Sequence, residues 1–444
     1  MNIGRLLLTL IVLVLLAAGG AVAWMAAGPG PLAFAQAQAP GAAYAGPSPK
    51  GVPAELAGAD LVTRGQYLTR AADCQGCHTA PGGKPFAGGR PFKTAFGVIY
   101  STNITPDAAT GIGAFTDAQF LRSMKQGIGR DGQRLYPAFP FDAYVHVADA
   151  DALSMKAYLF SLTPVRQAPR ANALAFPFNQ RWLMGIWSAL FVRDGDFQPV
   201  AGRSAEWNRG AYLAEALTHC GTCHTPRNLL QALDNRRKFA GGVASGWKAY
   251  NITSDRLTGV GAWRDDELAA YTAAGYAPGR GTAGGPMGEA ADLSHRFLTP
   301  SDIKAVVVYL RSIPALHSAD LPPPRAGPAP SSPRTDVAVI GEASGKRIFE
   351  GACASCHGWD GSGSLTTFAT LTGARAVNDP SAVNVAQMVV EGSRRRTPQG
   401  EAFMPAFGRA YSDAEIAAVA NYVTGRFGAR PAQLQAADVA KLRQ

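Results

Sequence analysis

Cys74-Gln-Gly-Cys77-His78 is the first of three pentapeptides with the pattern C-x-x-C-H. The other two are Cys220-Gly-Thr-Cys223-His224 and Cys353-Ala-Ser-Cys356-His357, and together the three contain all six cysteines of the chain. This pattern is the attachment signal of c-type haem. Two thiols about one helical turn apart can form thioethers with the two vinyl groups of one porphyrin, and the imidazole that follows can bind the iron. We therefore predict three covalently bound haem c groups.

Two other uses of paired cysteines explain the pattern less well. A structural zinc site needs four ligands, and no second Cys/His pair accompanies each motif. A redox dithiol does not require the histidine that ends all three motifs. The predicted site residues are the attachment cysteines Cys74, Cys77, Cys220, Cys223, Cys353 and Cys356, with His78, His224 and His357 as proximal iron ligands.

The composition is that of a globular chain. Of its 444 residues, 47% are hydrophobic and 17% are charged, which excludes wholesale disorder and argues against a coiled coil. Six cysteines are too few for a disulfide scaffold. The net charge of +10 suits a membrane surface or an acidic partner. No dense basic tract with interleaved aromatic residues is present, so we expect no nucleic-acid partner.

The N-terminal segment predicts a membrane location. An uncharged apolar run covers residues 6–27, which is long enough to span a bilayer, and Arg5 before it favours a cytoplasmic N-terminus. Ala33-Phe34-Ala35 is a candidate cleavage site, so a long signal peptide is the alternative. Since haem c is attached outside the cytoplasm, we expect a protein anchored at the periplasmic face of the bacterial inner membrane.

An internal repeat organises the chain. Asn103-Ile-Thr-Pro-Asp107 recurs as Asn251-Ile-Thr-Ser-Asp255, and Thr110 recurs with the same offset as Thr258. Apolar residues at three- and four-residue spacing predict a helix before each haem motif and another at the end of each repeat. The sequence thus predicts an all-α fold of three tandem class I cytochrome c-like modules.

The expected boundaries follow from this repeat and from composition. They are a membrane anchor or signal segment at 1–27, a flexible tether at 28–58, module 1 at 59–163, an apolar linker at 164–206, module 2 at 207–317, a Pro-rich linker at 318–340, module 3 at 341–429 and a C-terminal tail at 430–444. The apolar linker is expected to be a helix packed between modules, or else a surface that docks a partner or lies on the membrane.

Methionines in Gly/Pro-rich loops are the candidates for the sixth iron position. Met404 follows His357, and Met287 follows His224, at a distance along the chain that lets a loop return to the iron. A thioether ligand raises the reduction potential because sulfur favours ferrous iron. We predict Met287 and Met404 as axial ligands of the second and third haems.

The first module departs from this pattern. The repeat offset puts Phe139 where Met287 stands in the second module, and phenylalanine cannot bind iron. The first haem is expected to have an open or water-bound sixth position. His146 is the alternative ligand, and Met124 and Met155 are further alternatives that their spacing assigns to helix cores.

Two basic clusters are expected to be solvated faces. They are Arg236-Arg237-Lys238 and Arg394-Arg395-Arg396. The alternatives are neutralisation of haem propionates or docking of an acidic partner.

Several of these motifs together resemble the tri-haem cytochrome c subunit of bacterial membrane-bound periplasmic dehydrogenases of the alcohol, aldehyde or gluconate type. The resemblance covers roughly residues 58–427. It rests on Cys74–His78 with Thr79-Ala-Pro-Gly-Gly83, Phe86-Ala-Gly-Gly89, Ser101–Asp107, Leu135-Tyr-Pro-Ala138, Arg181-Trp-Leu-Met184, Gly210-Ala-Tyr-Leu213 and Cys220–Asn228. In that family the Leu-Tyr-Pro-Ala loop continues with methionine, and here it continues with Phe139.

The resemblance implies an electron-transfer subunit that is not an enzyme by itself. A catalytic dehydrogenase subunit with a quinone, flavin or molybdenum cofactor would deliver electrons, and ubiquinone or a terminal oxidase would receive them. The alternatives are a freestanding multihaem carrier and a haem peroxidase that uses an open first haem. No dinucleotide fingerprint, Ser/His/Asp set or paired carboxylate site stands out.

Overall fold

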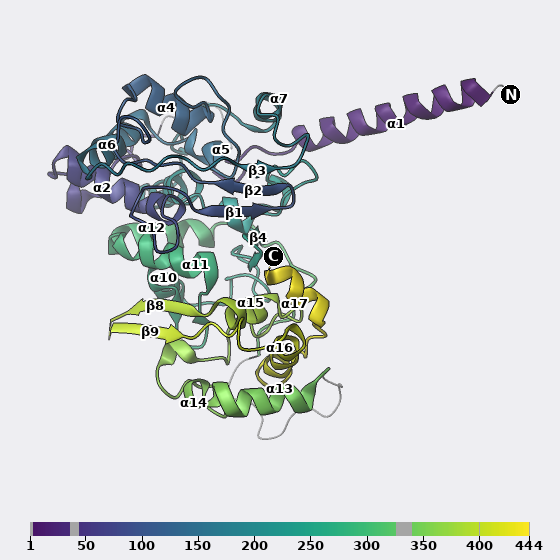
Figure 1. Ribbon diagram of the computed structural model, residues 1–444. Helices are drawn as coiled ribbons and strands as arrows, with labels where there is room; N and C mark the ends of the chain where they lie inside the picture. The colour runs from purple at the N-terminus through teal and green to yellow at the C-terminus, as the bar shows by residue number, and fades with distance from the viewer. Residues whose placement is uncertain (1–2, 36–43, 326–339, 399, 444) are drawn as a thin grey trace.

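The computed structural model describes residues 3–35, 44–325, 340–398 and 400–443. Helix α1 (Ile3–Ala26) projects from one side of a body built from three units (Figure 1). We name these units by their residues: the first unit is 59–163, the second is 207–317 and the third is 341–429. Each begins with an opening helix before its C-x-x-C-H motif and ends with a closing helix.

The first unit and the segment after it contain these elements: α2 (Leu61–Ala71), α3 (Cys74–Cys77), β1 (Pro91–Thr94), β2 (Gly97–Tyr100), α4 (Asp117–Gln126), α5 (Phe141–Tyr144), α6 (Asp149–Ser161), β3 (Ala173–Leu174) and α7 (Leu183–Phe191). Before α2 lies the 3-10 turn η1 (Ala54–Leu56). Side-chain caps fix the helix starts: Asp60 caps α2, and Thr116 forms a capping box on α4.

The second unit contains α8 (Ala205–Tyr212), the π-helical turn η2 (Leu213–Leu217), α9 (Gly221–His224), η3 (Asn235–Arg237), β4 (Gly242–Ala244), β5 (Trp247–Ala249), α10 (Asp265–Ala274), β6 (Tyr276–Ala277), β7 (Gly281–Thr282), α11 (Gly285–Leu293), η4 (His295–Phe297) and α12 (Pro300–Arg311). Ser204 caps α8, and Thr299 caps α12, which has Pro300 in its first turn.

The third unit and the chain end contain α13 (Glu342–Ile348), the π-helical turn η5 (Phe349–Cys353), α14 (Ala354–His357), η6 (Thr367–Ala369), α15 (Val383–Glu391), β8 (Ser393–Thr397), β9 (Gly400–Met404), α16 (Asp413–Phe427) and α17 (Ala436–Arg443). A capping box of Ser412 and Glu415 starts α16.

The three units share one helix crossing. A glycine of the opening helix lies against the backbone of the closing helix: Gly65 against Ser154, Gly210 against Ala305 and Gly345 against Ala418. A Cβ atom at any of the three glycines would overlap the carbonyl oxygen of its partner. Only glycine therefore lets the two helices of each unit approach so closely.

The fold is mainly helical, and the described residues add four small antiparallel sheets to the expected helices. They are β1-β2-β3, β4-β5, β6-β7 and β8-β9. The sheets occupy the Gly-rich loops between helices, where positive backbone angles, such as the φ of 123° at Gly97, allow tight hairpins.

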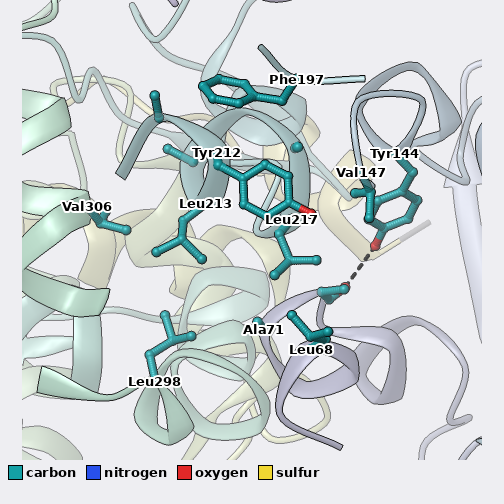
Figure 2. Packing of buried hydrophobic residues seen from close by; sticks show 14 of the residues in the cluster. Leu68, Ala71, Tyr144, Val147, Phe197, Tyr212, Leu213, Leu217, Leu298 and Val306 are labelled. Atoms are coloured by element: carbon teal, nitrogen blue, oxygen red, sulfur yellow. Dashed lines mark hydrogen bonds between the residues drawn. The ribbon is translucent and has the colours of Figure 1, made fainter. Parts of the chain in front are cut away.

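The first and second units share a single hydrophobic core. Residues of both units form one cluster, which Figure 2 shows around Tyr144, Leu68, Tyr212, Leu217 and Leu298. The third unit has its own core around Phe349, Val419 and Phe427.

The contact between the first two units is reciprocal. The Tyr67 hydroxyl donates to Asp302 (2.6 Å), and the Tyr212 hydroxyl donates to Asp151 (2.5 Å). Tyr67 and Tyr212 lie on the two opening helices, and Asp151 and Asp302 lie in the first turns of the two closing helices. The two repeats thus pair as the halves of a symmetric dimer do.

Two segments expected to be connectors are parts of the folded body. In the segment 164–206, β3 extends the β1-β2 sheet, and Phe197 and Val200 are buried in the shared core. The described parts of the expected tether are docked as well: Ala35 is buried, and Arg209 donates to the carbonyls of Pro49 and Gly51. The expected helix packed between the modules is present: Trp187 of α7 packs with Phe141 of the first unit and Ala232 of the second. Short apolar and carbonyl contacts with distant elements decide the packing of both segments.

The C-terminal tail is likewise packed. Helix α17 lies against α16, and Val439 is fully buried in the core of the third unit. Arg443 donates to the Tyr411 carbonyl (2.8 Å) and also binds Asp413. The segment that was expected to be a tail therefore completes the third unit.

Candidate haem-binding sites

The three C-x-x-C-H motifs occupy equivalent places after the opening helices. Asp73 (φ 50°) and His219 (φ 40°) directly precede the first cysteine of the first two motifs and have left-handed backbone conformations. This conformation is unusual outside glycine and turns the chain sharply out of the opening helix. The cysteines Cys74, Cys77, Cys220, Cys223, Cys353 and Cys356 are all half-buried and free of disulfides.

The three proximal histidines have the same hydrogen bond. Nδ1 lies 2.7 Å from the Thr102 carbonyl in His78, 2.6 Å from the Tyr250 carbonyl in His224 and 2.6 Å from the Ala369 carbonyl in His357. Burial lowers the pKa of all three imidazoles, so they are neutral at pH 7 with the proton on Nδ1. Nε2 is then the ring nitrogen that can bind a metal.

The thiols suit covalent attachment better than zinc binding or dithiol redox chemistry. Burial raises the pKa to about 12 for Cys77 and to about 11 for both Cys223 and Cys353. Zinc-binding and redox-active cysteines need thiolates, which a lowered pKa supplies. Within the described ranges, no group of three or more His, Cys, Asp or Glu side chains could hold a metal ion. The donor set therefore fits a porphyrin iron with histidine on one face.

Phe139 faces the proximal histidine of the first motif. The ring centroids of His78 and Phe139 are 6.4 Å apart, and the rings are nearly perpendicular. Phe139 also packs on Tyr144 (5.4 Å between centroids), whose hydroxyl donates to the Ala72 carbonyl (2.8 Å), the dashed line of Figure 2. Phe139 is thus held by α5 in the position that the repeat offset assigns to an axial ligand.

His146 is turned towards other partners. Its Nδ1 lies 2.6 Å from the Gly195 carbonyl, and Lys125, Asp196 and Lys238 are the charged groups that influence its pKa, which burial lowers. Its Nε2 is buried without a hydrogen-bond partner. The other two alternatives, Met124 and Met155, are buried in the shared core.

The two candidate methionine ligands lie on different kinds of element. Met287 is half-buried in the first turn of α11, just after Gly285, whose φ of 51° and contact with the Trp247 ring leave no space for a side chain. Met404 ends β9, is half-buried and packs against the core of the third unit. Both sit where a hairpin or glycine turn sets the direction of the side chain.

The expectation that both basic clusters are solvated was wrong for two residues. Arg395 is buried and bonds to Asp292 of the second unit, and Lys238 is buried in an ion pair with Glu215. Their neighbours Arg394 and Arg237 are not buried. Alternation along β8 and the turn after η3 send one side chain of each cluster inward, which the run of charges alone does not reveal.

One charged group beside the first motif was missed in the sequence. Burial, followed by the negative charge of Glu289, raises the pKa of Asp73 to about 7, while Arg90 opposes this shift. Arg90 binds Glu289 and donates to the Gly76 carbonyl (2.6 Å) inside the motif. The only sequence signal was an aspartate directly before Cys74.

The segment after the apolar N-terminal helix is docked on the second unit. The span Arg5–Ala26 is the one described helix that is long and apolar enough to cross a membrane, and its helical residues are exposed. In the last turns of this helix, Arg236 stacks on Trp24 at 4.0 Å, and after the helix Phe34 stacks on Phe239 at 6.5 Å. Arg193, close after α7, donates to the Ala26 carbonyl (2.7 Å), so α7 lies near the end of α1 (Figure 1).

Comparison with known protein families indicates the same class of protein as the candidate haem sites do. The profile of the family described as Cytochrome c matches residues 62–163 and 342–426, which lie in the first and third units. The fold and the motifs thus define a c-type cytochrome.

Relatives of known description narrow this class. The chain is 41% identical over 374 residues to one of the nicotinate dehydrogenase subunits of Pseudomonas putida, covering 84% of this chain and 31% of that protein. It is 36% identical to the fructose dehydrogenase cytochrome subunit of Gluconobacter japonicus, covering 86% of this chain and 82% of that one. It is 35% identical to the gluconate 2-dehydrogenase cytochrome c subunit of Pantoea cypripedii, covering 86% and 90%.

The chain belongs to the family of cytochrome c subunits of dehydrogenases. It is an electron-transfer subunit with haem c as its cofactor, rather than a catalytic subunit. It spans under a third of the length of the nicotinate dehydrogenase protein, but more than four fifths of the other two relatives.

Proposed function

We propose that the chain holds three haem c groups and relays electrons from a catalytic dehydrogenase subunit to membrane ubiquinone or another respiratory acceptor. The observation that carries this proposal is the shared arrangement of His78, His224 and His357, each behind a cysteine pair and each fixed through Nδ1 by a backbone carbonyl. A carbonyl that orients the ring and holds the proton on Nδ1 makes Nε2 a better iron ligand. When bound, haem c supplies one-electron redox chemistry.

The protein's residues would set the properties of each haem. Cys74 and Cys77, Cys220 and Cys223, and Cys353 and Cys356 form the thioethers. Met287 and Met404 are the sixth ligands of the second and third haems and raise their potentials. Phe139 keeps the first haem without a sixth protein ligand, since its ring faces His78.

Mass spectrometry of the protein from a host that matures c-type cytochromes tests the haem count. We expect three haem additions, and the replacement of either cysteine in a motif should remove or weaken one of them. A mature wild-type chain with two additions or fewer would contradict the proposal. Counting iron by elemental analysis gives an independent measure.

The partner is proposed from the relatives. The fructose and gluconate proteins are named as cytochrome subunits of dehydrogenases, so we infer a catalytic subunit that oxidises an organic substrate with its own quinone, flavin or molybdenum cofactor. Purification from the native membrane checks this. A stable complex with a dehydrogenase subunit is expected, whereas isolation of the chain alone in every mild detergent would favour a freestanding carrier.

A retained anchor at the periplasmic face of the inner membrane is proposed from the packing after α1. Phe34 stacks on Phe239, and Ala35 is 2% exposed, so cleavage after Ala35 would remove residues that pack in the fold. On and just before α7, Trp182 and Ile186 are exposed close to the end of α1, as befits a surface lying at a membrane. N-terminal sequencing of the mature protein should therefore find residues 6–27 still present; a chain that begins near Gln36 would contradict this.

A further inference from the structure

Helix α11 of the second unit contacts both of the other units. It carries Met287 in its first turn and then Glu289 and Asp292 on its following turns. It contacts α3 of the first haem motif, and it also contacts β8 of the third unit. The candidate methionine ligand of the second haem therefore lies on a helix whose neighbours include both of the other units.

A buried arginine of the third unit binds this helix through several hydrogen bonds. Arg395 on β8 donates from Nε to Asp292 (3.0 Å), from Nη1 to the Ala283 carbonyl (2.6 Å) and from Nη2 to the Ala274 carbonyl (2.9 Å). Its side chain is only 4% exposed. Ala283 lies just before α11 and Asp292 lies near its end, so one guanidinium fixes the chain on both sides of Met287.

Apolar contacts from the third unit support the same loop. Met388 of α15 packs directly on Gly284, and Ala374 packs directly on Gly281. The Thr282 hydroxyl donates to the Phe368 carbonyl (2.7 Å). The turn that leads into Met287 is thus packed by residues of the third unit as well as by Trp247 of the second unit.

The first unit holds α11 from the other side. Arg90 donates to both carboxylate oxygens of Glu289, with Nη2 at 2.6 Å from Oε2, and at the same time to the Gly76 carbonyl within the first haem motif. This planar, two-point pairing restricts rotation more than a single hydrogen bond does. Glu289 lies two residues after Met287.

We propose that Arg395 of the third unit and Arg90 of the first unit are positioning residues for Met287, and that together they keep this methionine on the iron of the second haem. The proposal rests on the assignment of Met287 as that haem's sixth ligand. Neither arginine touches the iron; each acts by fixing α11. A consequence is that docking of the outer units governs the ligation, and hence the potential, of the middle one.

Proton NMR of the reduced holoprotein first tests the ligand assignment on which the proposal rests. Ligated methionine methyl groups give strongly upfield-shifted signals, and we expect two such sets. Met287→Phe should abolish one set and so identify it. If no set disappears, the assignment of Met287 is wrong, and this outcome is distinct from a failure of the positioning proposal.

Binding of imidazole to the ferric holoprotein then tests the arginines, because imidazole competes with a loosely held methionine. With Arg395→Gln we expect about a tenfold or greater rise in imidazole affinity at the second haem, and with Arg90→Gln a smaller rise at the same haem. The Met404 signals should persist, because backbone pairing of β8 with β9 holds Met404 in place.

Arg394→Gln is the matched control, since Arg394 is on the same strand, is 67% exposed and pairs with Glu401. Its imidazole affinity should equal that of the wild type. If Arg395→Gln does not fold, Asp292→Asn removes the charge of the partner while keeping its shape, and it should loosen Met287 in the same way. The proposal would be overturned by folded Arg395→Gln and Asp292→Asn proteins in which the imidazole affinity of the second haem, measured apart from the open first haem, stays within about twofold of the wild type.

Discussion

The first and second units are built alike but differ beside their haem motifs. In both, an asparagine side chain links the loop after the motif to the chain after the closing helix: Asn103 donates to the Val165 carbonyl (2.7 Å), and Asn251 donates to the Leu316 carbonyl (2.5 Å). The proximal histidines are also held alike. Residues that build the scaffold are thus repeated in both units.

The two units differ at residues that do not form the shared helix contacts. Phe139 occupies the position in the first unit that Met287 occupies in the second. Likewise, Asp73 directly precedes the first motif, and His219 directly precedes the second. Aromatic packing on Tyr144 holds Phe139, so the loop keeps its shape without a bond to iron. We therefore expect the first and second haems to differ in potential, because only these few side chains near the proposed iron sites change.

Exchange of the two distal residues should have the largest effect on this difference. Phe139→Met should convert the first haem to low-spin His/Met ligation and raise its potential by on the order of 0.1 V, within the roughly 0.8 V range that axial ligands cover. The high-spin fraction of the ferric protein and carbon monoxide binding by the ferrous protein should both fall. Optical spectra and redox titration measure these changes.

Met287→Phe is the reverse exchange and serves as the control. It should lower the potential of the second haem and open that haem to carbon monoxide. A wild-type spectrum in which all haems are low-spin, with no carbon monoxide binding, would contradict the assignment of Phe139.

The helix crossings offer the next largest effect, and here the two units should respond alike. Gly65→Ala and Gly210→Ala each place a Cβ atom against a carbonyl of the closing helix, so we expect each to lower the free energy of unfolding by about 1–3 kcal/mol. Gly351→Ala is the control, because its Cβ would meet nothing within 4 Å. Denaturant unfolding measures the three variants; Gly65→Ala and Gly210→Ala proteins as stable as Gly351→Ala would contradict the shared crossing.

Sequence alone predicted what local spacing encodes. The cysteine pairs, the histidines and the helices that flank them could be read directly, because attachment to one porphyrin and helix periodicity both impose short-range patterns. The repeat offset placed Phe139 opposite a histidine, and the rings of His78 and Phe139 do face each other.

Long-range packing could not be read in this way. The core shared by the first two units depends on residues such as Phe197 from a segment that looked like a linker. Arg395 looked like one of three solvated arginines, and only its partner Asp292, far away in the sequence, explains its burial. A run of charges or a linker-like composition shows which segments favour water. Which side chain of such a segment is buried depends on contacts with residues far away in the sequence.

Asp73 should give the first haem a pH dependence that the second lacks. Its pKa of about 7 lies above its usual value, so the folded protein keeps the proton between about pH 4 and 7, and stability falls as the pH rises through that window. Deprotonation near pH 7 adds a negative charge that favours ferric iron. The potential of the first haem should therefore fall as the pH rises, by at most about 59 mV per pH unit.

Redox titration at pH 6, 7 and 8 measures this slope. Asp73→Asn should flatten the slope of the first haem, whereas the second haem should stay flat near pH 7 because burial lowers the pKa of His219 and keeps it neutral. A slope that survives in Asp73→Asn would assign the proton to another group.

His146→Ala should have the smallest effect on the first haem. It tests directly whether the first and second units differ by an open position or by a histidine ligand. The Nε2 atom of His146 is buried without a hydrogen-bond partner, as expected of a nitrogen that binds iron. Its Nδ1 is bound to the Gly195 carbonyl, however, and its charged neighbours are Lys125, Asp196 and Lys238 rather than Asp73 of the haem motif. Phe139, by contrast, contacts the His78 ring itself. We therefore expect the spin state and potential of the first haem to remain unchanged in His146→Ala, with Phe139→Met as the positive control. A new high-spin signal in His146→Ala would show that His146 binds the iron and that the first haem differs from the second by a histidine rather than by an open position.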